Sequence, residues 1–372
     1  MSDDDYLIFG PGDVDLARSP LRRGISAATY VLGAFNPGLA RLPNGNLLLM
    51  VRVAEALSEP VADGAVHAIR WADGEYVLDA WPLDQVAMDD PRQFAIRGHA
   101  HKVLALTSLS WLLPVELDAE GRRIVAVHYD RAIAPEIDHE QYGIEDARIT
   151  RIDGTYYMTT CAVSAERHAT TLLTSANGLD WQRHGIVLDH QNKDMILFEG
   201  KVGGAYMALT RPLGDCWFAY PPGSGHAPGP SINLARSPDA LHWKPHDRPF
   251  LRPRVGSVSG MKLGGGSQPV LSDDGWLMLY HGVERQGAVG VYRTFWALLD
   301  RDDPATILRL EDETAVLEAA PHLTAPIAHR LYLPTPVVFT TGVADGGDRW
   351  IVASGEADLA CRISHLPKAL FR

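Results

Sequence analysis

The stretch DARITRIDGTYYMTTCAVS, residues 146–164, decides the fold class of this chain. It contains an apolar strand, a tight turn at Asp153-Gly154 and a second apolar strand rich in aromatic residues. An Asp-Gly pair supplies the positive φ angles that a two-residue hairpin requires. The stretch therefore predicts a β-hairpin.

The same unit recurs along the chain, which indicates an architecture built from repeats. Each copy has two apolar strands around a glycine-containing turn, and the further copies span residues 36–55, 194–212, 267–284 and, in a worn form, 335–358. A shorter repeat, 175–181 and 237–243, follows two of these units and ends on tryptophan each time. Each copy of this shorter repeat follows a short strand, at 170–173 and 232–235, so the repeat predicts the turn of an outer hairpin.

Two hairpins per unit make a four-stranded blade, and five units predict an all-β, five-bladed β-propeller. We expect one catalytic domain over residues 1–372, with residues 1–30 as an N-terminal extension that packs on the propeller. The long first interval must hold extra strands, for which 67–78 and 103–127 are candidates, and an insertion near 84–96. A two-domain β-sandwich remains the alternative.

Composition excludes several functional classes. The 372 residues carry 46 acidic and 34 basic side chains, a net charge of −12, which argues against wrapping a nucleic-acid backbone. Three cysteines without a C-x-x-C pair exclude a disulfide scaffold and a zinc ribbon. His99 and His101 would share a strand face, but they lack a third ligand, so we expect no metal site. The acidic start and the lack of a long apolar run predict a cytoplasmic protein without a membrane segment.

Two acids, Glu145 and Asp146, stand at the entrance of an otherwise apolar strand. Acidic residues are rare inside strands. In a propeller, strands that line the axis end at a central channel, so these carboxylates would reach a shared cleft. The alternative is an Asp that caps a turn and pairs with Arg148.

Basic residues recur at corresponding ends of the other units. Lys193 precedes the third unit and Arg211 closes it, while Lys262 precedes the fourth and His281 closes it; Tyr292 follows eleven residues later. If these ends converge, they form a site for an anion such as phosphate. Otherwise they are exposed strand ends that pair with surface carboxylates.

Three of these segments resemble glycoside hydrolase family 130, which contains β-mannoside phosphorylases and related β-mannosidases. The segments are GIEDARITRIDGTYYMTTCAVS from Gly143, NKDMILFEGKVGGAYMALTRP from Asn192 and MKLGGGSQPVLSDDGWLMLYHGV from Met261. The likeness covers roughly residues 30 to 360 and implies a five-bladed propeller. Ala147, Glu199 and Gly200 depart from the family pattern.

The resemblance also implies roles for single residues. Asp146 matches the proton donor, which in the family acts through the 3-hydroxyl of the mannose. The phosphate-binding positions match Lys193, Arg211, Lys262, His281 and Tyr292. Asn36, Arg52 and Asp358 fall where the family contacts mannose, and we include Asp194 in this sugar-binding set.

One carboxylate beside a cationic cluster favours an inverting β-mannoside phosphorylase that needs no cofactor and uses inorganic phosphate as co-substrate. An inverting glycosidase would instead need a second carboxylate as base, for which Glu199 and Glu284 are candidates. A non-catalytic sugar-binding propeller is a further alternative. The expected partners are a β-mannoside oligosaccharide and phosphate, with no nucleic acid or membrane, and homo-oligomer formation stays open.

Overall fold

The computed structural model describes residues 4–188, 190–214, 218–287 and 289–372, and this part of the chain is all-β. Helical structure is confined to the short α1 (Pro321–Thr324) and to 3-10 turns. These turns are Pro11–Asp13, Leu16–Arg18, Pro20–Arg23, Leu83–Gln85, Tyr129–Arg131, Asp138–Glu140, Ala325–Arg330 and Lys368–Phe371. The all-β prediction is thus confirmed.

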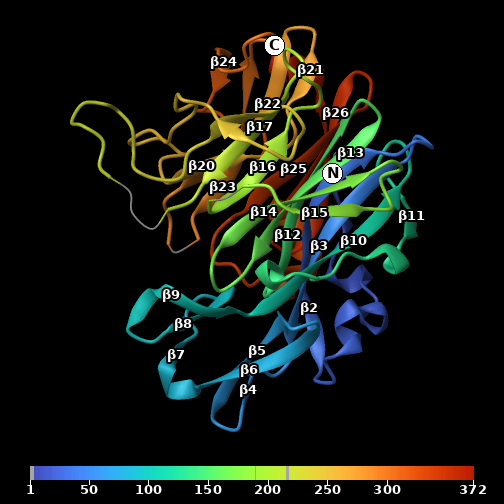
Figure 1. Ribbon diagram of the computed structural model, residues 1–372, viewed down its shortest axis with the longest axis vertical. Helices are drawn as coiled ribbons and strands as arrows, with labels where there is room; N and C mark the ends of the chain where they lie inside the picture. The colour runs from blue at the N-terminus through green and yellow to red at the C-terminus, as the bar shows by residue number, and fades with distance from the viewer. Residues whose placement is uncertain (1–3, 189, 215–217, 288) are drawn as a thin grey trace.

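The largest sheet crosses the molecule in Figure 1 and combines strands from both ends of the chain. Its order is β15 (Gln182–Ile186), β14 (His168–Ser175), β13 (Thr155–Val163), β12 (Gly143–Ile152), β10 (Ser108–Leu117), β3 (Leu47–Leu57), β2 (Thr29–Arg41), β27 (Ala360–Pro367), β26 (Arg349–Glu356) and β25 (Val338–Asp345), with β1 (Asp5–Phe9) on β27 and β11 (Ile124–Val127) on β10. Single parallel pairs, Ser110 with Gly143 and Ala34 with Ala360, join three antiparallel groups into this sheet.

Two further antiparallel sheets contain the third and fourth repeats. One has the order β16 (Asn192–Leu197), β17 (Tyr206–Pro212), β18 (Asn233–Ser237) and β19 (Lys244–Pro245). The other has β20 (Lys262–Gly265), β22 (Gly275–Glu284), β23 (Val291–Leu299) and β24 (Ile307–Glu311), with β21 (Val270–Ser272) on β22. All five sequence repeats therefore form hairpins, as predicted, namely β2–β3, β12–β13, β16–β17, β21–β22 and β25–β26.

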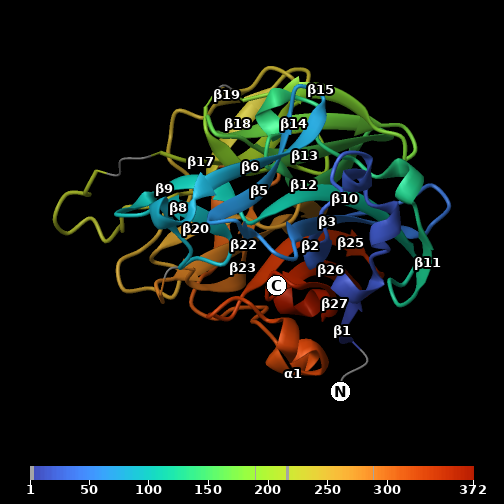
Figure 2. The same cartoon turned by 90° about the horizontal axis from the view of Figure 1, so that it is seen from below.

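The long first interval holds two small three-stranded sheets. One is β4 (Val61–Ala62), β5 (Ala65–Ala72) and β6 (Glu75–Pro82), and the other is β7 (Val86–Ala87), β8 (Gln93–Ile96) and β9 (His99–Leu106). We call residues 58–107 the insertion. It lies below the large sheets in Figure 1 and in front of them when the molecule is seen from below (Figure 2).

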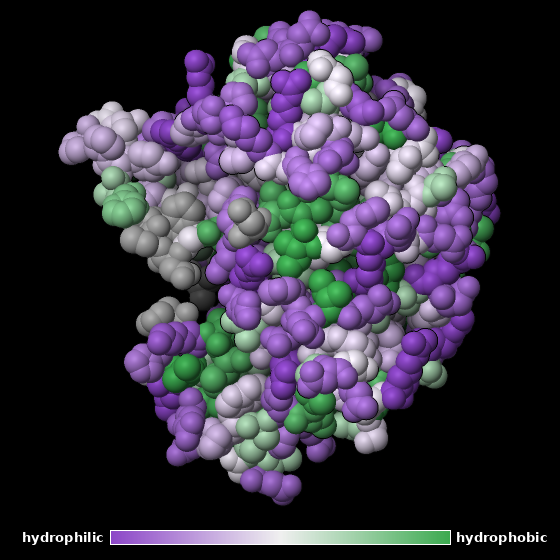
Figure 3. All heavy atoms as spheres, in the orientation of Figure 1, coloured by the Kyte–Doolittle hydropathy of each residue, from purple (hydrophilic) through white to green (hydrophobic). Residues whose placement is uncertain are grey.

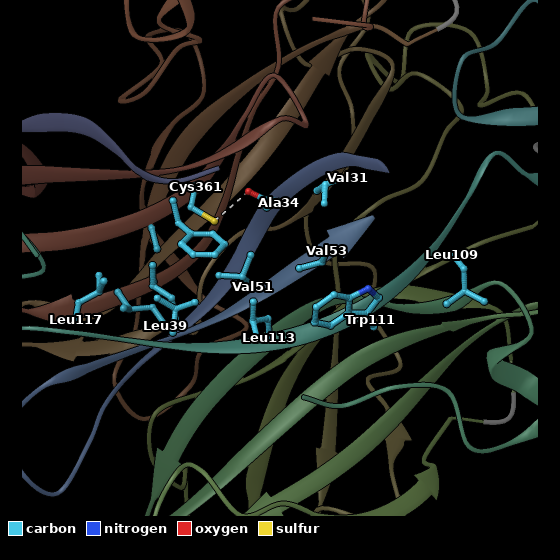
Figure 4. Packing of buried hydrophobic residues seen from close by; sticks show 14 of the residues in the cluster. Val31, Ala34, Leu39, Val51, Val53, Leu109, Trp111, Leu113, Leu117 and Cys361 are labelled. Carbon is cyan, nitrogen blue, oxygen red and sulfur yellow. Dashed lines mark hydrogen bonds between the residues drawn. The ribbon is translucent and has the colours of Figure 1, made fainter. Parts of the chain in front are cut away.

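The central strands are apolar on both faces because a separate core covers each face. Leu47, Leu49, Val51 and Val53 of β3 belong to one buried cluster, whereas Leu48 and Met50 belong to another. Figure 4 shows part of the first cluster, where Trp111 of β10 lies beside Val53. Each such buried side chain contributes about 1.5–3 kcal/mol.

The N-terminal residues are tied to this core by a buried carboxylate. Glu55 of β3 accepts hydrogen bonds from Ser19 Oγ (2.5 Å), Arg22 Nη2 (2.8 Å) and Trp111 Nε1 (3.2 Å). The first strand of this N-terminal segment, β1, pairs with β27 of the large sheet. The segment 4–30 therefore packs on the large sheet, while the single-domain organisation of residues 1–372 stays a prediction.

Hydrophilic residues cover most of the face shown in Figure 3, and apolar residues gather near its centre and over the insertion at the lower left. Within the described ranges, no helix is long and apolar enough to cross a membrane. Cys161 and Cys361 are buried free thiols, and Cys216 lies outside the described residues.

We expect Trp111→Ala to destabilise the fold by about 3–5 kcal/mol, because it removes a fully buried aromatic side chain and leaves a cavity. Urea denaturation would measure the loss. Val125→Ala is the control, since Val125 is 56% exposed and its truncation should change stability by less than about 0.5 kcal/mol. Equal effects of the two substitutions would contradict the assigned core.

Candidate active site

A pocket of about 520 Å³ opens where the insertion faces the ends of the large sheets; we call it the main pocket. It brings together nearly all residues that the sequence singled out. Its lining includes Asn36, Arg52, Asp146, Lys193, Asp194, Arg211, Lys262, Tyr292 and Asp358. His281 is the exception among the predicted site residues, because it is fully buried behind the lining.

Three of the lining residues sit at β-bulges in the first strand of a repeat. The φ angles of Asn36, Asp146 and Asp194 are 48°, 50° and 55°. The ladders of β2, β12 and β16 each shift register at these positions. Asn and Asp tolerate the left-handed region better than most residues, and a bulge re-aims a side chain. In these three repeats, the bulge therefore directs one Asx side chain each into the main pocket.

Asp146 is the centre of a network of charge-assisted hydrogen bonds. Its Oδ1 accepts from Asn36 Nδ2 at 2.9 Å and from Arg52 Nη1 at 3.0 Å. Arg52 Nη2 also donates to Glu145 Oε1 at 2.7 Å. The alternative interpretation, a turn-capping Asp146 paired with Arg148, does not describe the side chain, because Asp146 pairs with Arg52 and Arg148 donates to the backbone oxygen of Asp146.

Asp146 and Asp358, two carboxyl groups of the main pocket whose pKa values Arg52 lowers, differ in proton affinity. Burial acts to raise the pKa of Asp146, but the charges of Arg52, Arg148 and Lys193 outweigh it and lower the pKa to about 2. Burial dominates at Asp358 and raises its pKa to about 6, although Arg52 opposes this. In the substrate-free protein, Asp146 is therefore ionised near neutral pH, and Asp358 takes up a proton more readily.

Lys193 lies in the main pocket but its ammonium is already engaged. Its Nζ donates to Glu145 Oε2 at 3.0 Å. Burial would lower the pKa of Lys193, but Glu145 and the neighbouring acids raise it above the usual range. Glu145 thus holds both Arg52 and Lys193, a positioning role that sequence reasoning did not assign to it.

Arg211 forms a second buried group with Asp194 and His281. Its Nη1 lies 3.0 Å from Asp194 Oδ2 and donates to His281 Nε2 at 3.3 Å. Burial and the adjacent cations hold the pKa of His281 well below its usual value. His281 is therefore neutral and orients Arg211 from behind, whereas sequence reasoning predicted that it would contact phosphate.

Lys262 differs from the other cations of the main pocket. Within the described residues it has no carboxylate partner, and its Nζ lies 4.8 Å from the centre of the Tyr292 ring. Burial, reinforced by Arg211 and Lys193, lowers its pKa to about 7. A buried ammonium in this setting gains free energy when an anion binds beside it.

Sequence reasoning missed residues that reach the main pocket from two loops and from the first position of β14. Arg92, from the insertion, is fixed by hydrogen bonds to both carboxylate oxygens of Asp90 at 3.0 and 2.8 Å. Tyr332 donates to the backbone oxygen of Asp358 at 3.0 Å, and His168 has a pKa lowered to about 3, mainly by burial. Their only signal in the sequence was the unexplained insertion and the long loops between repeats.

The candidate bases of a hydrolase lie elsewhere. Neither Glu199 nor Glu284 lines the main pocket. The backbone N–H of Glu199 bonds to Pro269, and burial raises the pKa of its side chain to about 6 near Gln268. Glu284 accepts from Arg293 Nη1 at 2.8 Å. Among the described residues, no three His, Cys, Asp or Glu side chains are placed to hold a metal ion, and the side chain of His101 lies outside them.

Comparison with known proteins supplies the family. A model of glycoside hydrolase family 130, described as beta-1,4-mannooligosaccharide phosphorylase, matches residues 119–370. The chain belongs to this family. A β-1,2-mannobiose phosphorylase from Listeria innocua is 31% identical over 88% of this chain and 87% of its own length. A 1,2-β-oligomannan phosphorylase from a Thermoanaerobacter species is 33% identical over 62% of this chain and 70% of its own.

Two solved structures agree with the fold. The Listeria innocua β-1,2-mannobiose phosphorylase in complex with β-1,2-mannobiose has a TM-score of 0.80 and 28% identity, covering 100% of this chain and 98% of its own. A glycosyl hydrolase from Bacteroides ovatus has a TM-score of 0.62 at 18% identity, covering 90% and 84%, and it shows the fold alone. The family resemblance seen in the three sequence segments is thus confirmed.

A substitution at Gly264 of β20 would test how closely the side chains behind the main pocket are packed. A Cβ at this position would overlap the imidazole of His281 and the carboxylate of Asp194. We expect Gly264→Ala to displace both groups and lower turnover about a hundredfold, because small misplacements in active sites have effects of this size. Gly12→Ala is the matched control, since a Cβ on Gly12 meets nothing within 4 Å. Steady-state kinetics would compare them, and equal activities would refute the proposed arrangement.

Proposed function

We propose that this protein is an inverting β-mannoside phosphorylase, which cleaves a β-mannosidic bond with inorganic phosphate and yields α-mannose 1-phosphate. The observation that carries the proposal is a buried cation, Lys262, without a carboxylate partner among the described residues, in the same pocket as Asp146. The printed activities of the family relatives support the same class.

The chemistry follows from the charge arrangement. A phosphate oxygen attacks the anomeric carbon on the face opposite the leaving sugar, while a proton passes to the glycosidic oxygen. Phosphate is itself an anionic nucleophile, so no carboxylate base is required. Lys262, Arg211 and Lys193 would hold it in line with the anomeric carbon and offset its charge. Tyr292 borders the same place, and His281 acts through Arg211.

Asp146 is the proposed proton donor, and its low pKa in the free protein requires an explanation. The cations that lower the pKa include Arg52 and Lys193. A phosphate dianion bound among the cations of the pocket offsets their field, so the pKa of Asp146 rises when the co-substrate is present. Asn36, Arg52, Asp194 and Asp358 would bind and orient the mannose.

The pocket disfavours the alternatives. An inverting β-mannosidase needs a base that activates water on the face opposite the acid, and Glu199 and Glu284 lie outside the main pocket. A non-catalytic sugar-binding protein would not require strained Asx residues and strongly shifted pKa values in one pocket.

We further propose that the five hairpin units are the blades of a single five-bladed propeller around the main pocket. The consecutive antiparallel groups and the short parallel joins between neighbouring groups support this architecture. We also propose a cytoplasmic location and catalysis without a cofactor. The free thiols of Cys161 and Cys361 support the location, and a pocket lined by cationic side chains that suit an anion supports the second point. The oligomeric state stays open.

The deciding experiment is turnover of β-1,2- and β-1,4-mannobiose with and without phosphate. We expect cleavage to require phosphate and to release α-mannose 1-phosphate, detected by NMR. Phosphate-independent release of mannose would establish the hydrolase instead, and binding without turnover would establish a sugar-binding protein.

Asp146→Asn should retain the fold and disaccharide binding but lower turnover about 10²–10⁴-fold, because it removes the proton donor. Asp358→Asn is the matched comparison, since Asp358 holds a proton more readily in the free protein but is assigned to sugar binding. We expect it to raise KM for the disaccharide more than it lowers kcat. A larger fall in kcat for Asp358→Asn than for Asp146→Asn would reverse the two roles.

Lys262→Met should raise the KM for phosphate at pH 6 at least tenfold, because Lys262 is protonated there and pairs with the anion. The pKa of about 7 means that Lys262 loses its charge as the pH rises above 7. The wild-type affinity for phosphate should therefore fall from pH 6 to 8.5 more steeply than that of the variant. The ionisation of phosphate itself changes the KM of both proteins equally, so it cancels in the ratio of the two KM values at each pH. Identical pH profiles of KM for the wild type and the variant would show that Lys262 does not bind phosphate.

A further inference from the structure

Arg148 of β12 is a buried cation that neither binds phosphate nor contacts the sugar in the proposed reaction. It is 2% exposed and does not line the main pocket, so it lies behind the lining as His281 does. An arginine side chain stays protonated in proteins, and a buried charge is costly unless the groups around it compensate it. The groups that surround Arg148 therefore decide what it does in the site.

Arg148 supports the backbone of the proposed proton donor. The ladder between β12 and β13 skips from Glu145 to Arg148, so the two residues between them have no partner on β13. Asp146 is one of these two, with a φ of 50°, and Arg148 Nη1 donates to its backbone oxygen at 2.9 Å. A strained bulge persists only where its surroundings hold it in place. Arg148 thus supplies a hydrogen bond at the point where the ladder is interrupted.

The same guanidinium also holds the segment that follows Lys262. Arg148 Nε donates to the backbone oxygen of Gly266 at 2.7 Å. Gly266 comes directly after β20, the strand that begins with Lys262, and its own N–H donates to the backbone oxygen of Leu279 at 3.0 Å. One side chain therefore ties the bulge of the proton donor to the sheet that supplies Lys262 to the proposed phosphate site.

Asp194 and Phe339 complete the surroundings of Arg148. Arg148 Nη2 lies 3.6 Å from Asp194 Oδ1, and Arg211 Nη1 lies 3.0 Å from Asp194 Oδ2. The guanidinium carbon of Arg148 lies 5.1 Å from the centre of the Phe339 ring. That ring also contacts His281, with the two ring centres 4.7 Å apart. Arg148 and Arg211 thus share one carboxylate, and the aromatic ring packs on both Arg148 and the imidazole behind Arg211.

The two arginines share Asp194 unevenly in the substrate-free protein. Arg148 Nη2 is buried and makes no hydrogen bond within the described residues. A phosphate that binds Arg211 competes with Asp194 for the same guanidinium, because both are anionic acceptors. Asp194 can then turn toward Arg148, where Nη2 is available to donate. Arg148 would therefore keep Asp194 in place when phosphate enters the main pocket.

We propose that Arg148 is a positioning residue that fixes the proton donor relative to the phosphate site. In an inverting displacement, the donor and the nucleophile act on opposite faces of one sugar ring, so their relative placement limits the rate. Arg148 holds the backbone of Asp146 directly, and it holds the two phosphate-binding strands through Gly266 and Asp194. This inference rests on the proposed phosphorylase function.

The test replaces Arg148 by lysine, which keeps the charge but loses the planar fork that reaches several acceptors. We expect Arg148→Lys to lower kcat for phosphorolysis of β-mannobiose about a hundredfold, since small displacements in active sites have effects of this size. The KM for phosphate should rise about tenfold, because Arg148 and Arg211 belong to one network. The KM for mannobiose should change less than about threefold, since the other contacts to the sugar stay in place.

Arg362→Lys is the matched control. Arg362 is 4% exposed, and its Nη1 donates to the backbone oxygen of Glu318 and to Glu356 Oε2, both at 2.8 Å. Neither Arg362 nor these two partners line the main pocket. We expect this variant to lower the melting temperature but to leave kcat and both KM values within about twofold of the wild type. Equal kinetics for the two variants, at a temperature where both are folded, would make Arg148 merely structural and overturn the inference.

A substitution of Phe339 carries the test if Arg148→Lys does not fold. Phe339→Leu keeps the guanidinium and an apolar side chain but removes the ring on which Arg148 packs. We expect kcat to fall about tenfold, because a desolvated contact between a cation and an aromatic ring has an energy that corresponds to a factor of this size. An unchanged kcat would overturn the inference.

Hydrolysis and phosphate binding separate this inference from the proposed function. If the wild type cleaves mannobiose without phosphate, the phosphorylase assignment fails. A hundredfold lower hydrolytic kcat in Arg148→Lys, but not in Arg362→Lys, would still support the positioning of Asp146. If there is no turnover, calorimetry with inorganic phosphate decides. Binding about tenfold weaker in Arg148→Lys than in Arg362→Lys supports the link to the phosphate site, and equal affinities overturn it.

Discussion

The buried bridge of Arg52 to Glu145 and Asp146 is the interaction on which the site depends. Buried ion pairs are costly unless every member is well bonded. Here Arg52 donates to both acids, Glu145 also accepts from Lys193, and Asn36 donates to Asp146. These residues come from β2, β3, β12 and β16, so the bridge joins strands of three sequence repeats. Its satisfied hydrogen bonds compensate the burial of charge at the point where the reacting sugar would sit.

The same charge balance explains how a pocket rich in acids can bind an anion. Arg52, Lys193, Arg148 and Arg211 each lie within 4 Å of a carboxylate oxygen. Lys262 does not, among the residues that the structure describes, and its pKa is lowered as a result of burial beside other cations. The strained bulges at Asn36, Asp146 and Asp194 are sustained by the dense cores on both faces of the central strands. Stability in the sheets thus supports an active-site geometry that would be unfavourable alone.

What the sequence could predict depended on the range of the interaction. Turns such as Asp153-Gly154 are decided by two adjacent residues, so all five hairpins were predictable. The convergence of Lys193, Arg211 and Lys262 could be predicted from their equivalent places in the repeats. The carboxylate that pairs with each cation could not be predicted, because the pairing depends on bulges and on neighbouring strands. Lys193 therefore turned out to be paired with Glu145, and His281 to lie behind Arg211.

The role of the insertion could not be predicted from sequence patterns, since Arg92 lines the main pocket only because of the tertiary packing of β7–β9. This packing divides the pocket into two kinds of wall. The wall with Asp146, Arg211 and Lys262 belongs to the sheets and shares their rigidity, because those side chains come from paired strands. The opposing residues belong to small hairpins that contact the sheets through Tyr142, Cys161 and Val163 in a separate core cluster. Substitutions in those hairpins therefore change one wall of the pocket while the strands that carry Asp146, Arg211 and Lys262 stay as they are.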